Sequence, residues 1–431
     1  MFDREQEFLK RNGVDVAGID RDELLGLFAD EMDAGLAGRK SSLMMIPSFI
    51  AIDRPVKTGT PVVVLDAGGT NLRAAVVTLD GKGGAEIGDF MKSEMPGTKE
   101  EIGAEAFFEA FADFVMPLVE RSGNIGFCFS YAAEVTPECD ARLIRWSKQI
   151  KAPEVEGRLI GTGLKRKLAM RGHERNVVIL NDTVATLLAG KSAGDARGYS
   201  AYVGFILGTG TNTAYVEHNA RITKRDDICP EGSMAINVES GSFGRVRQSA
   251  FDKTLDESTQ DPGYYMFEKM ISGAYLGKLG HIVLKAAADE GFFTPSAAAL
   301  LDRWETISSK RLDDFCGNSP KPDNPFLAKD FSDADRAAII TLCGPLYERA
   351  AVLTAVNLAS AIIKTGEGHD PARPVCVNVD GSTYYRTLTA DFQNRVRREL
   401  KDLLEPMGIA YELVRIDDSP VIGAAVAGLM L

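Results

Sequence analysis

Two apolar runs near the start of the chain are separated by a pair of glycines. Residues 61–66 (PVVVLD) form a continuous apolar run rich in β-branched side chains, which is typical of a buried strand. Gly68 and Gly69 interrupt this run, and a second strand-like segment continues over residues 72–79. The pattern therefore predicts two strands joined by a glycine turn.

The same patterns predict further strands and helices along the chain. Apolar runs predict strands at residues 124–130, 176–180, 199–207 and 374–379. Apolar residues at helical spacing predict helices within residues 3–37, 103–121, 264–290 and 333–364. Residues 42–52 are also apolar, but Pro47 interrupts them, and we expect a docked loop there rather than a strand.

Length and an internal similarity both suggest two related halves. The chain has 431 residues, about three times a domain of ~150 residues. Residues 65–71 (LDAGGTN) can be aligned with residues 206–212 (ILGTGTN), and each segment follows an apolar strand and leads into another. So short a match is weak evidence alone, but with this length it suggests two α/β halves that present glycine hairpins at one cleft.

Composition excludes several classes of protein. Hydrophobic residues make up 45% of the chain and charged residues 26%, as in ordinary soluble proteins. The net charge of -12 argues against a general nucleic-acid or anionic-membrane binder, because both need a surplus of positive charge. The start of the chain lacks the apolar region of a secretory signal, and the longest apolar stretches are shorter than the ~20 residues of a membrane span.

The cysteines and histidines form no metal-ligand spacing. No two of the six cysteines are close enough for a CxxC motif, which favours free thiols in a reducing cytoplasm. His173, His218, His281 and His369 are equally scattered, so no structural zinc site is expected. We therefore expect a soluble, cytoplasmic protein.

The two glycine hairpins suit the binding of phosphate. Without a Cβ, glycine lets backbone N–H groups approach phosphate oxygens, and it accepts the positive φ of a tight turn. Thr70, Asn71, Thr209 and Thr211 would add hydroxyl and amide donors. Neither segment fits the P-loop pattern GxxxxGK[ST] or the dinucleotide pattern GxGxxG. Considered singly, each hairpin is equally well explained as a structural turn.

A carboxylate follows the predicted strand at residues 176–180, in the sequence Asn181-Asp182-Thr183. In α/β folds the C-terminal end of a strand meets a ligand cleft. A carboxylate there can accept the proton of an alcohol while the alcohol oxygen attacks phosphorus. The alternative is an aspartate that caps a helix starting at Thr183, and these residues alone favour that alternative.

A series of segments in chain order adds a family resemblance. LDAGGTNLR (65–73) is similar to the LDLGGTNFR phosphate motif of eukaryotic-type hexokinases and glucokinases. INVESGSFG (236–244) resembles the family's VNxEWGAFG, and residues 251–277 resemble its FDxxxDExSxNPGxQxxEKMISGxYLG. Further similar segments are Phe129-Ser130, WSKQIKAPEVEG (146–157), LNDTVATLLAG (180–190), GFILGTGTNTAYVE (204–217) and VDGS (379–382). The resemblance covers about residues 28–431, and eight motifs in the family's order are specific.

The resemblance implies a hexose site and a catalytic base. Asp182 matches the family's base, and Lys148 matches the lysine beside the reacting hydroxyl and phosphoryl group. The residues expected to line the hexose are Ser130, Ser147, Lys148, Asn181, Asp182, Asn212, Glu239 and Glu268. Carboxylates and amides suit this task, because each sugar hydroxyl is both a donor and an acceptor.

The resemblance also implies a site for ATP and Mg²⁺. Asp66 is expected to orient the water ligands of Mg²⁺ without binding the ion directly. The residues expected on the nucleotide side are Asp66, Gly68, Gly69, Thr70, Asn71, Arg73, Gly208, Thr209, Gly210, Gly381 and Ser382.

The implied architecture is the α/β actin-like ATPase (ribonuclease H-like) fold, with two lobes around a central cleft. Residues 1–58 and 183–416 are expected in the large lobe, and residues 59–182 and 417–431 in the small lobe. The implied activity is ATP-dependent phosphorylation of D-glucose and other hexoses at the 6-hydroxyl, the first step of glycolysis, by a monomer or homodimer. Two alternatives stay open: a hexokinase-like sugar sensor, and an actin-like ATPase that acts on proteins.

Several positions depart from the family's pattern, and four of them are Tyr131, Ser147, Gln149 and Ser240. We expect all four beside the sugar contacts and none at the base or the phosphate hairpins. Phosphoryl transfer is therefore expected to be intact, whereas the preferred hexose and its affinity stay open.

Overall fold

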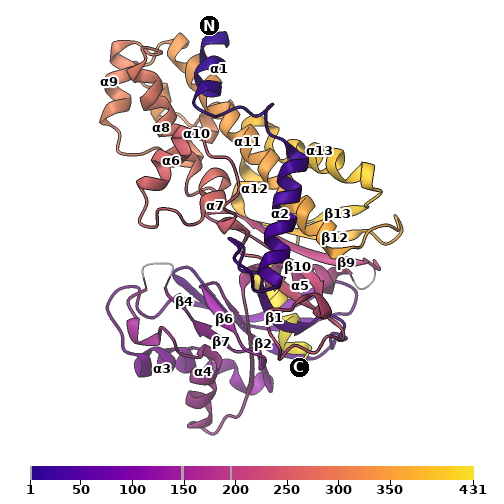
Figure 1. Cartoon of the computed structure of the whole chain (residues 1–431). Helices are drawn as coiled ribbons and strands as arrows, with labels where there is room; N and C mark the ends of the chain where they lie inside the picture. Colours follow the sequence, from indigo (N-terminus) through magenta and orange to yellow (C-terminus); the bar gives the residue numbers. More distant parts are fainter. Residues whose placement is uncertain (1, 147–149, 195–196) are drawn as a thin grey trace.

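The predicted strands assemble into two large sheets, one built mainly from residues 61–180 and one built mainly from later residues (Figure 1). The structure is a computed structural model that describes residues 2–146, 150–194 and 197–431. Both predicted glycine hairpins are present, one in each sheet.

The five-stranded sheet contains the first hairpin. Its order is β4-β3-β2-β5-β8, and its strands are β2 (Pro61–Gly68), β3 (Asn71–Leu79), β4 (Ala85–Glu94), β5 (Asn124–Phe129) and β8 (Asn176–Leu180). β2 pairs antiparallel with β3, whereas β2, β5 and β8 run parallel to one another. The residues that follow these three parallel strands therefore meet at one edge of the sheet.

The six-stranded sheet contains the second hairpin, in which Leu207 pairs with Thr211. Its order is β1-β11-β10-β9-β12-β13, and its strands are β1 (Ile46–Ala51), β9 (Ala201–Leu207), β10 (Thr211–His218), β11 (Ser233–Asn237), β12 (Val375–Asp380) and β13 (Tyr411–Val414). A separate hairpin pairs β6 (Ala133–Val135) with β7 (Ala141–Leu143), and β6 contacts β1.

The prediction of a loop at residues 42–52 is wrong for its second half. β1 is a strand at the edge of the sheet and pairs antiparallel with β11. Pro47 lies opposite Ile236, and the register shifts between Pro47 and Ala51. Proline lacks a backbone N–H, but an edge strand tolerates it because only one of its sides needs a complete ladder.

Helices cover the outer faces of both sheets (Figure 1). On the five-stranded sheet these helices are α3 (Ala104–Val115) and α4 (Ile160–Ala169). On the other sheet, α11 (Asp333–Thr365) packs against β10 and is contacted by α1 (Phe2–Arg11), α2 (Arg21–Leu36), α7 (Met266–Ile271), α8 (Leu276–Asp289), α10 (Ser309–Cys316) and α13 (Phe392–Leu404). Further helices are α6 (Ala250–Glu257), α9 (Pro295–Arg303) and α12 (Ser382–Arg386). Short 3₁₀ turns occur at Met116–Arg121, Pro153–Val155, Asn219–Arg221, Ser240–Ser242, Pro325–Leu327, Thr389–Asp391 and Glu405–Met407.

α11 also has the length and apolar composition of a membrane-crossing helix. It is the one such helix in the part of the chain that the structure describes, and 72% of its most apolar stretch is buried within the protein. A helix that is apolar on every side is stable in water only when most of its surface is buried, and this is the situation of a central core helix.

Two helices fill the space between the sheets. α5 (Asp182–Gly194) packs on β9 and β12, and α14 (Ser419–Leu429) packs on β2, β5 and α5. The contact requires glycine, because a Cβ at Gly423 would lie 1.8 Å from the backbone oxygen of Ala185. A Cβ at Gly126 in β5 would likewise lie 1.8 Å from the backbone oxygen of Ala424. One apolar core cluster therefore includes side chains from both sheets and from both helices.

We predict that Gly423→Ala destabilises the protein by about 1–3 kcal/mol, because neither backbone at this crossing can move away freely. Gly26→Ala is the matched control: Gly26 is exposed on α2, and a Cβ there meets nothing within 4 Å. Removing a glycine from a helix interior in open space should stabilise by about 0.5–1 kcal/mol. Unfolding in denaturant measures both changes, and equal stability of the two variants would contradict the packing argument.

Candidate active site

The carboxyl ends of β2, β5 and β8 bring Asp66, Ser130 and Asp182 to one edge of the sheet. The backbone N–H of Ser130 donates to the carbonyl of Ala67 at 3.1 Å, which holds the end of β5 beside the end of β2. Burial raises the pKa of the Cys128 thiol, and the nearby carboxylates of Asp66 and Asp182 raise it further. Both carboxylates thus lie close to the same buried thiol.

Asn181, and not Asp182, caps the helix that follows β8. α5 begins at Asp182, and the backbone N–H of Thr183 donates to Oδ1 of Asn181 at 2.8 Å. The alternative of a capping aspartate is therefore wrong, because Asp182 is already the first residue of the helix and Asn181 occupies the capping position before it. Oδ1 of Asp182 accepts a hydrogen bond from the hydroxyl of Thr183 at 3.3 Å.

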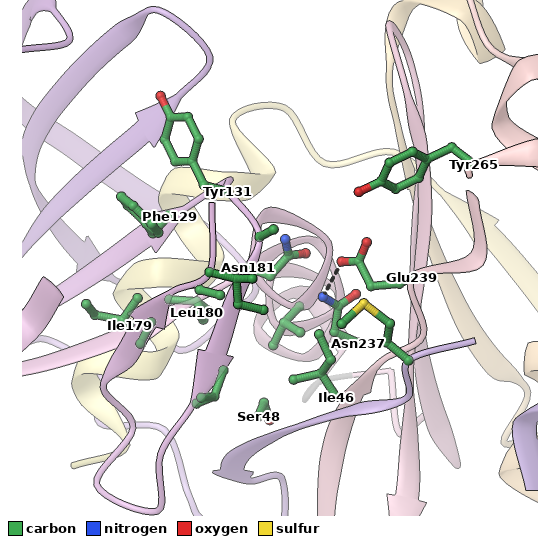
Figure 2. A pocket seen from close by; sticks show the side chains of 17 residues that line it. Ile46, Ser48, Phe129, Tyr131, Ile179, Leu180, Asn181, Asn237, Glu239 and Tyr265 are labelled. Atoms are coloured by element: carbon green, nitrogen blue, oxygen red, sulfur yellow. Dashed lines mark hydrogen bonds between the residues drawn. The ribbon is translucent and has the colours of Figure 1, made fainter. Parts of the chain in front are cut away.

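A carboxylate held by two amides faces Asn181 from the other sheet (Figure 2). Oε1 of Glu239 accepts a hydrogen bond from Nδ2 of Asn237 at 2.7 Å and from Nδ2 of Asn212 at 3.2 Å. Burial, together with the charge of Asp182, raises the pKa of Glu239. The backbone of Glu239 is left-handed, with φ 58° and ψ 47°, a conformation that a side chain this long seldom adopts and that often marks a functional site.

Glu268 lies in the first turn of α7, close to Glu239. Its Oε2 accepts a hydrogen bond from the backbone N–H of Thr211 at 2.8 Å, and a Cβ at Gly210 would lie 2.6 Å from the same oxygen. Burial raises the pKa of Glu268 to about 7; the Thr211 N–H opposes this shift, and the charge of Glu239 adds to it. The second glycine hairpin therefore binds the Glu268 carboxylate, in addition to any phosphate that it holds.

Two residues that line this site were missed by the sequence analysis. Asn237 orients Glu239, and its signal was the asparagine in the family's VNxEWG pattern. Tyr265 lines the same pocket (Figure 2), and its hydroxyl accepts a hydrogen bond from Nη2 of Arg145 at 3.1 Å across the cleft. The sequence feature that could have identified Tyr265 is a departure from the family pattern, which has glutamine at this position, three residues before Glu268.

The first phosphate hairpin turns at Gly69 and Thr70. Gly69 has φ 65°, which only glycine adopts without strain, and Thr70 is exposed. Nη1 of Arg73 lies 3.5 Å from Oδ2 of Asp66, opposite it in the β2–β3 ladder. The remaining predicted residues of this hairpin, Gly68 and Asn71, pair with each other across the turn.

Tyr131 corrects an expectation from the sequence. It lines the pocket with Asn181 and Glu239, as expected, but it is not away from the phosphate hairpins, because its hydroxyl donates to the carbonyl of Gly69. The cause is topological: β5 runs parallel to β2, so the chain that leaves β5 passes beside the turn after β2. Ser240, by contrast, is fully buried, and its hydroxyl lies 3.0 Å from that of Thr213.

The second hairpin packs against the start of α12. The carbonyl of Gly208 accepts a hydrogen bond from the N–H of Gly273 at 2.9 Å and from the hydroxyl of Thr383 at 2.7 Å. Gly381 has φ 111°, and a Cβ there would lie 2.3 Å from the backbone oxygen of Leu207. The predicted nucleotide residues Gly208, Gly381 and Ser382 therefore lie together.

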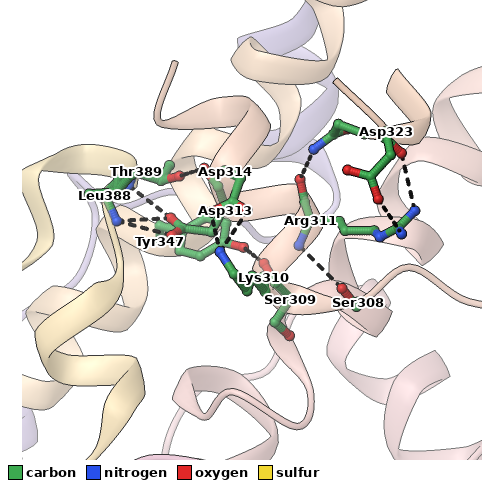
Figure 3. Close-up of polar contacts among 11 residues, drawn as sticks. Ser308, Ser309, Lys310, Arg311, Asp313, Asp314, Asp323, Tyr347, Leu388 and Thr389 are labelled. Carbon is green, nitrogen blue, oxygen red and sulfur yellow. Dashed lines mark hydrogen bonds and ion pairs between the residues drawn. The ribbon is translucent and has the colours of Figure 1, made fainter. Parts of the chain in front are cut away.

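A pocket of about 260 Å³ opens beside this hairpin, lined by Thr209 and Ser382 and by residues of α10. Polar contacts hold its far wall (Figure 3): the Asp313 carboxylate accepts from the N–H groups of Leu388 and Thr389, at 3.1 and 2.9 Å. Lys310 and Arg386 line the pocket together with Asp313 and Asp314, and Nζ of Lys310 donates to both oxygens of Asp314 at 2.8 and 2.7 Å. The arrangement suits a ligand with a phosphate tail and a larger body.

Three positions of interest lie outside the described residues, namely Ser147, Lys148 and Gln149. Within the described part of the chain, no cluster of three or more histidine, cysteine, aspartate or glutamate side chains could hold a metal ion by itself.

Comparison with known proteins identifies the family. Two family models, both described as hexokinase, match residues 13–192 and 202–430. The chain is 28% identical to a hexokinase of Schistosoma mansoni, over 99% of this chain and 96% of that protein. It is 31% identical to Hexokinase-2 of Oryza sativa, over 92% and 85%, and 30% identical to Hexokinase-1 of Arabidopsis thaliana, over 92% and 84%.

Solved structures confirm the predicted fold. A hexokinase from Schistosoma mansoni complexed with glucose superposes with a TM-score of 0.80 at 27% identity, covering 99% of this chain and 98% of that one. A second hexokinase crystal structure gives 0.81 at 25% identity, covering 100% and 99%. The ROK hexokinase of Thermus thermophilus, at 18% identity and a TM-score of 0.51 over 86% and 98%, shares the fold alone. The chain belongs to the hexokinase family.

Proposed function

We propose that this ATP-dependent hexokinase phosphorylates D-glucose and other hexoses at the 6-hydroxyl. The observation that carries the proposal is the convergence of Asp182 and Asn181 from one sheet with Glu239 and Glu268 from the other. Amides and a backbone N–H hold these carboxylates in place, so the acceptors for a ring of hydroxyls exist before any sugar binds. The related Schistosoma mansoni structure contains glucose, which supports this choice of substrate.

Asp182 is the base in this proposal. Asn181 satisfies the helix N–H, so the carboxylate of Asp182 can accept the proton of the 6-hydroxyl while that oxygen attacks the γ-phosphorus of ATP in line. Lys148, named from the family resemblance, would stabilise charge at the transferred group. Glu239 and Glu268 bind other hydroxyls and fix the ring, which aligns the attacking oxygen.

Mg²⁺ is part of the proposal. Asp66 is 5% exposed and lies beside the first hairpin, and a single carboxylate suits an ion that prefers oxygen ligands and keeps several waters. When bound with ATP, the ion supplies charge neutralisation at the phosphates. The hairpin residues Gly68–Asn71 and Gly208–Gly210 would hold the phosphates through backbone N–H groups, and Gly381 and Ser382 would lie near the adenosine.

We further propose that the enzyme serves the first step of glycolysis in the cytoplasm, as a monomer or homodimer without nucleic-acid or membrane partners. The acidic net charge of -12 supports the exclusion of polyanionic partners. A sugar sensor would not need the base, and a protein-directed ATPase would not need Asn212, Glu239 and Glu268.

We predict that Asp182→Ala lowers kcat at least ~10²-fold, the low end for loss of a general base, while glucose still binds. An assay that couples glucose 6-phosphate to NADPH formation measures the rate, and calorimetry measures glucose binding. Asp302→Ala, at an exposed position on α9, is the control and should keep the parent activity. Activity of Asp182→Ala within tenfold of the parent would remove Asp182 from its role, and an inactive parent would refute the function itself.

We predict that the KM for glucose falls by up to about tenfold between pH 6 and pH 8. With a pKa of about 7, Glu268 is mostly protonated at pH 6 and ionised at pH 8, and only the ionised form offers both oxygens to hydroxyl donors. Glu268→Gln should remove this dependence and raise the KM about 10- to 100-fold, since a charged hydrogen bond is lost. A pH dependence that survives in Glu268→Gln would assign it to another group.

The same pKa predicts how stability depends on pH. Folding raises the pKa of Glu268 from 4.5 to about 7, so the folded protein holds this proton more tightly than the unfolded chain. The contribution of Glu268 to stability is therefore complete below pH 4.5 and is lost as the pH rises through 7. Denaturant unfolding of the parent and of Glu268→Gln should diverge over this window, with the variant relatively more stable at pH 8; parallel profiles would contradict the assignment.

A further inference from the structure

Tyr131 joins the predicted hexose side of the site to the first phosphate hairpin. It follows Ser130 directly, its side chain is almost completely buried, and its hydroxyl donates to the carbonyl of Gly69. It is also one of the positions that depart from the family's pattern. We infer that Tyr131 is a positioning residue that sets the orientation of the first phosphate hairpin for phosphoryl transfer, an inference that rests on the proposed function.

Peptide geometry explains how one hydroxyl can do this. The bond between Gly69 and Thr70 is trans and planar, so its C=O and N–H point in opposite directions. A carbonyl held by Tyr131 therefore directs the N–H of Thr70 away from the tyrosine, and Thr70 is exposed there. The carbonyl of Thr70 is held in turn by the N–H of Met95 at 2.9 Å. The two peptides that follow Gly69 and Thr70 are thus each held from outside the turn.

A glycine turn needs such a support. Glycine has more accessible backbone conformations than any other residue, so the Gly68-Gly69 turn would lose its orientation easily if nothing held it. A phosphate bound by backbone N–H groups requires these groups to be aligned before the ligand arrives, because alignment on binding weakens the transition-state contacts. The hydroxyl of Tyr131 supplies the alignment without contacting the nucleotide.

The tyrosine ring is itself immobilised. Its centroid lies 4.8 Å from the ring of Phe129 and 4.9 Å from the ring of Trp146, which meets it edge-on. Nε1 of Trp146 donates to the carbonyl of Ala152 at 2.8 Å, and its backbone N–H donates to Oε1 of Glu156 at 3.0 Å. Trp146 directly precedes Ser147 and Lys148. One rigid aromatic cluster therefore connects the hairpin to the segment assigned to the reacting hydroxyl.

The hydroxyl is a donor throughout the working pH range. Burial raises the pKa of Tyr131 above its usual value of 10, and the charge of Asp66 raises it further. The phenol therefore stays protonated, and a carbonyl oxygen is the partner that a permanent donor needs.

The decisive variant is Tyr131→Phe, which removes the hydroxyl and keeps the ring between Phe129 and Trp146. We expect kcat/KM for ATP to fall about 3- to 10-fold, the range for loss of one buried hydrogen bond, with the glucose affinity measured by calorimetry unchanged within twofold. Incorporation of 4-aminophenylalanine, which restores a donor at the same position, should recover most of the loss. Tyr215→Phe, which removes another buried tyrosine hydroxyl, controls for general destabilisation and should leave kcat/KM for ATP unchanged.

Amide hydrogen exchange provides a readout that does not need activity. In Tyr131→Phe the peptide covering residues 66–73 should exchange faster than in the parent, and residues 206–212 of the second hairpin should not change. Unchanged exchange in both hairpins, or a kcat/KM for ATP within twofold of the parent, would overturn the inference. Equal losses toward glucose and ATP would also overturn it, by showing a packing role. A parent without hexokinase activity would instead refute the proposed function and leave the exchange result to decide on Tyr131.

Discussion

The crossing of α5 and α14 between the two sheets is the contact on which the rest of the site depends. Gly423 and Gly126 bring backbones together at distances that no side chain allows, so the five-stranded sheet, α14, α5 and the six-stranded sheet form one continuous stack. The first residues after β8 therefore face the other sheet in a fixed direction. Asp182 stands at the start of α5, where this direction brings its charge near Glu239.

The proposed sugar site holds two carboxylates, Glu239 and Glu268, at positions where burial disfavours their charged form. Burial raises the pKa of both Glu239 and Glu268; the charge of Asp182 raises that of Glu239 further, and the charge of Glu239 raises that of Glu268 further. Two amides and one backbone N–H offset part of this penalty but do not remove it. Sugar hydroxyls can supply the missing donors. In the free protein, the charged forms of these two carboxylates are thus destabilised, because they lack hydrogen-bond donors. A ligand with many hydroxyls would stabilise them by donating hydrogen bonds.

Sequence patterns were sufficient to predict the elements that depend only on residues close together in the chain. The β-branched runs and the glycine turns predicted both hairpins, and the motif order predicted Asn181, Asp182, Asn212 and Glu268 near Glu239 but not Asn237 or Tyr265. The strand β1 was predicted wrongly, because Pro47 would be incompatible with a central strand. Proline is tolerated in an edge strand, and whether a strand lies at an edge depends on partners distant in sequence. The cap of α5 could not be assigned either, since Asn181 and Asp182 are adjacent, both residue types are good caps, and the choice depends on the residue at which the helix begins. Tyr131 and Tyr265 depend on contacts with Gly69 and Arg145, and no local pattern encodes contacts 62 and 120 residues apart.

The two phosphate hairpins are supported by different halves of the molecule. The first is held by Tyr131 and Met95, which belong with its own sheet, and the second by Gly273 and Thr383 from the other half. No hydrogen bond joins the two hairpins within the described residues. The distance between them therefore follows the relative position of the sheets, and the sugar contacts also come from both sheets. A hexose that bonds both sets favours one arrangement, and this arrangement fixes the phosphate site as well. In the proposed function, sugar binding and phosphate alignment would therefore be coupled through the relative position of the two sheets.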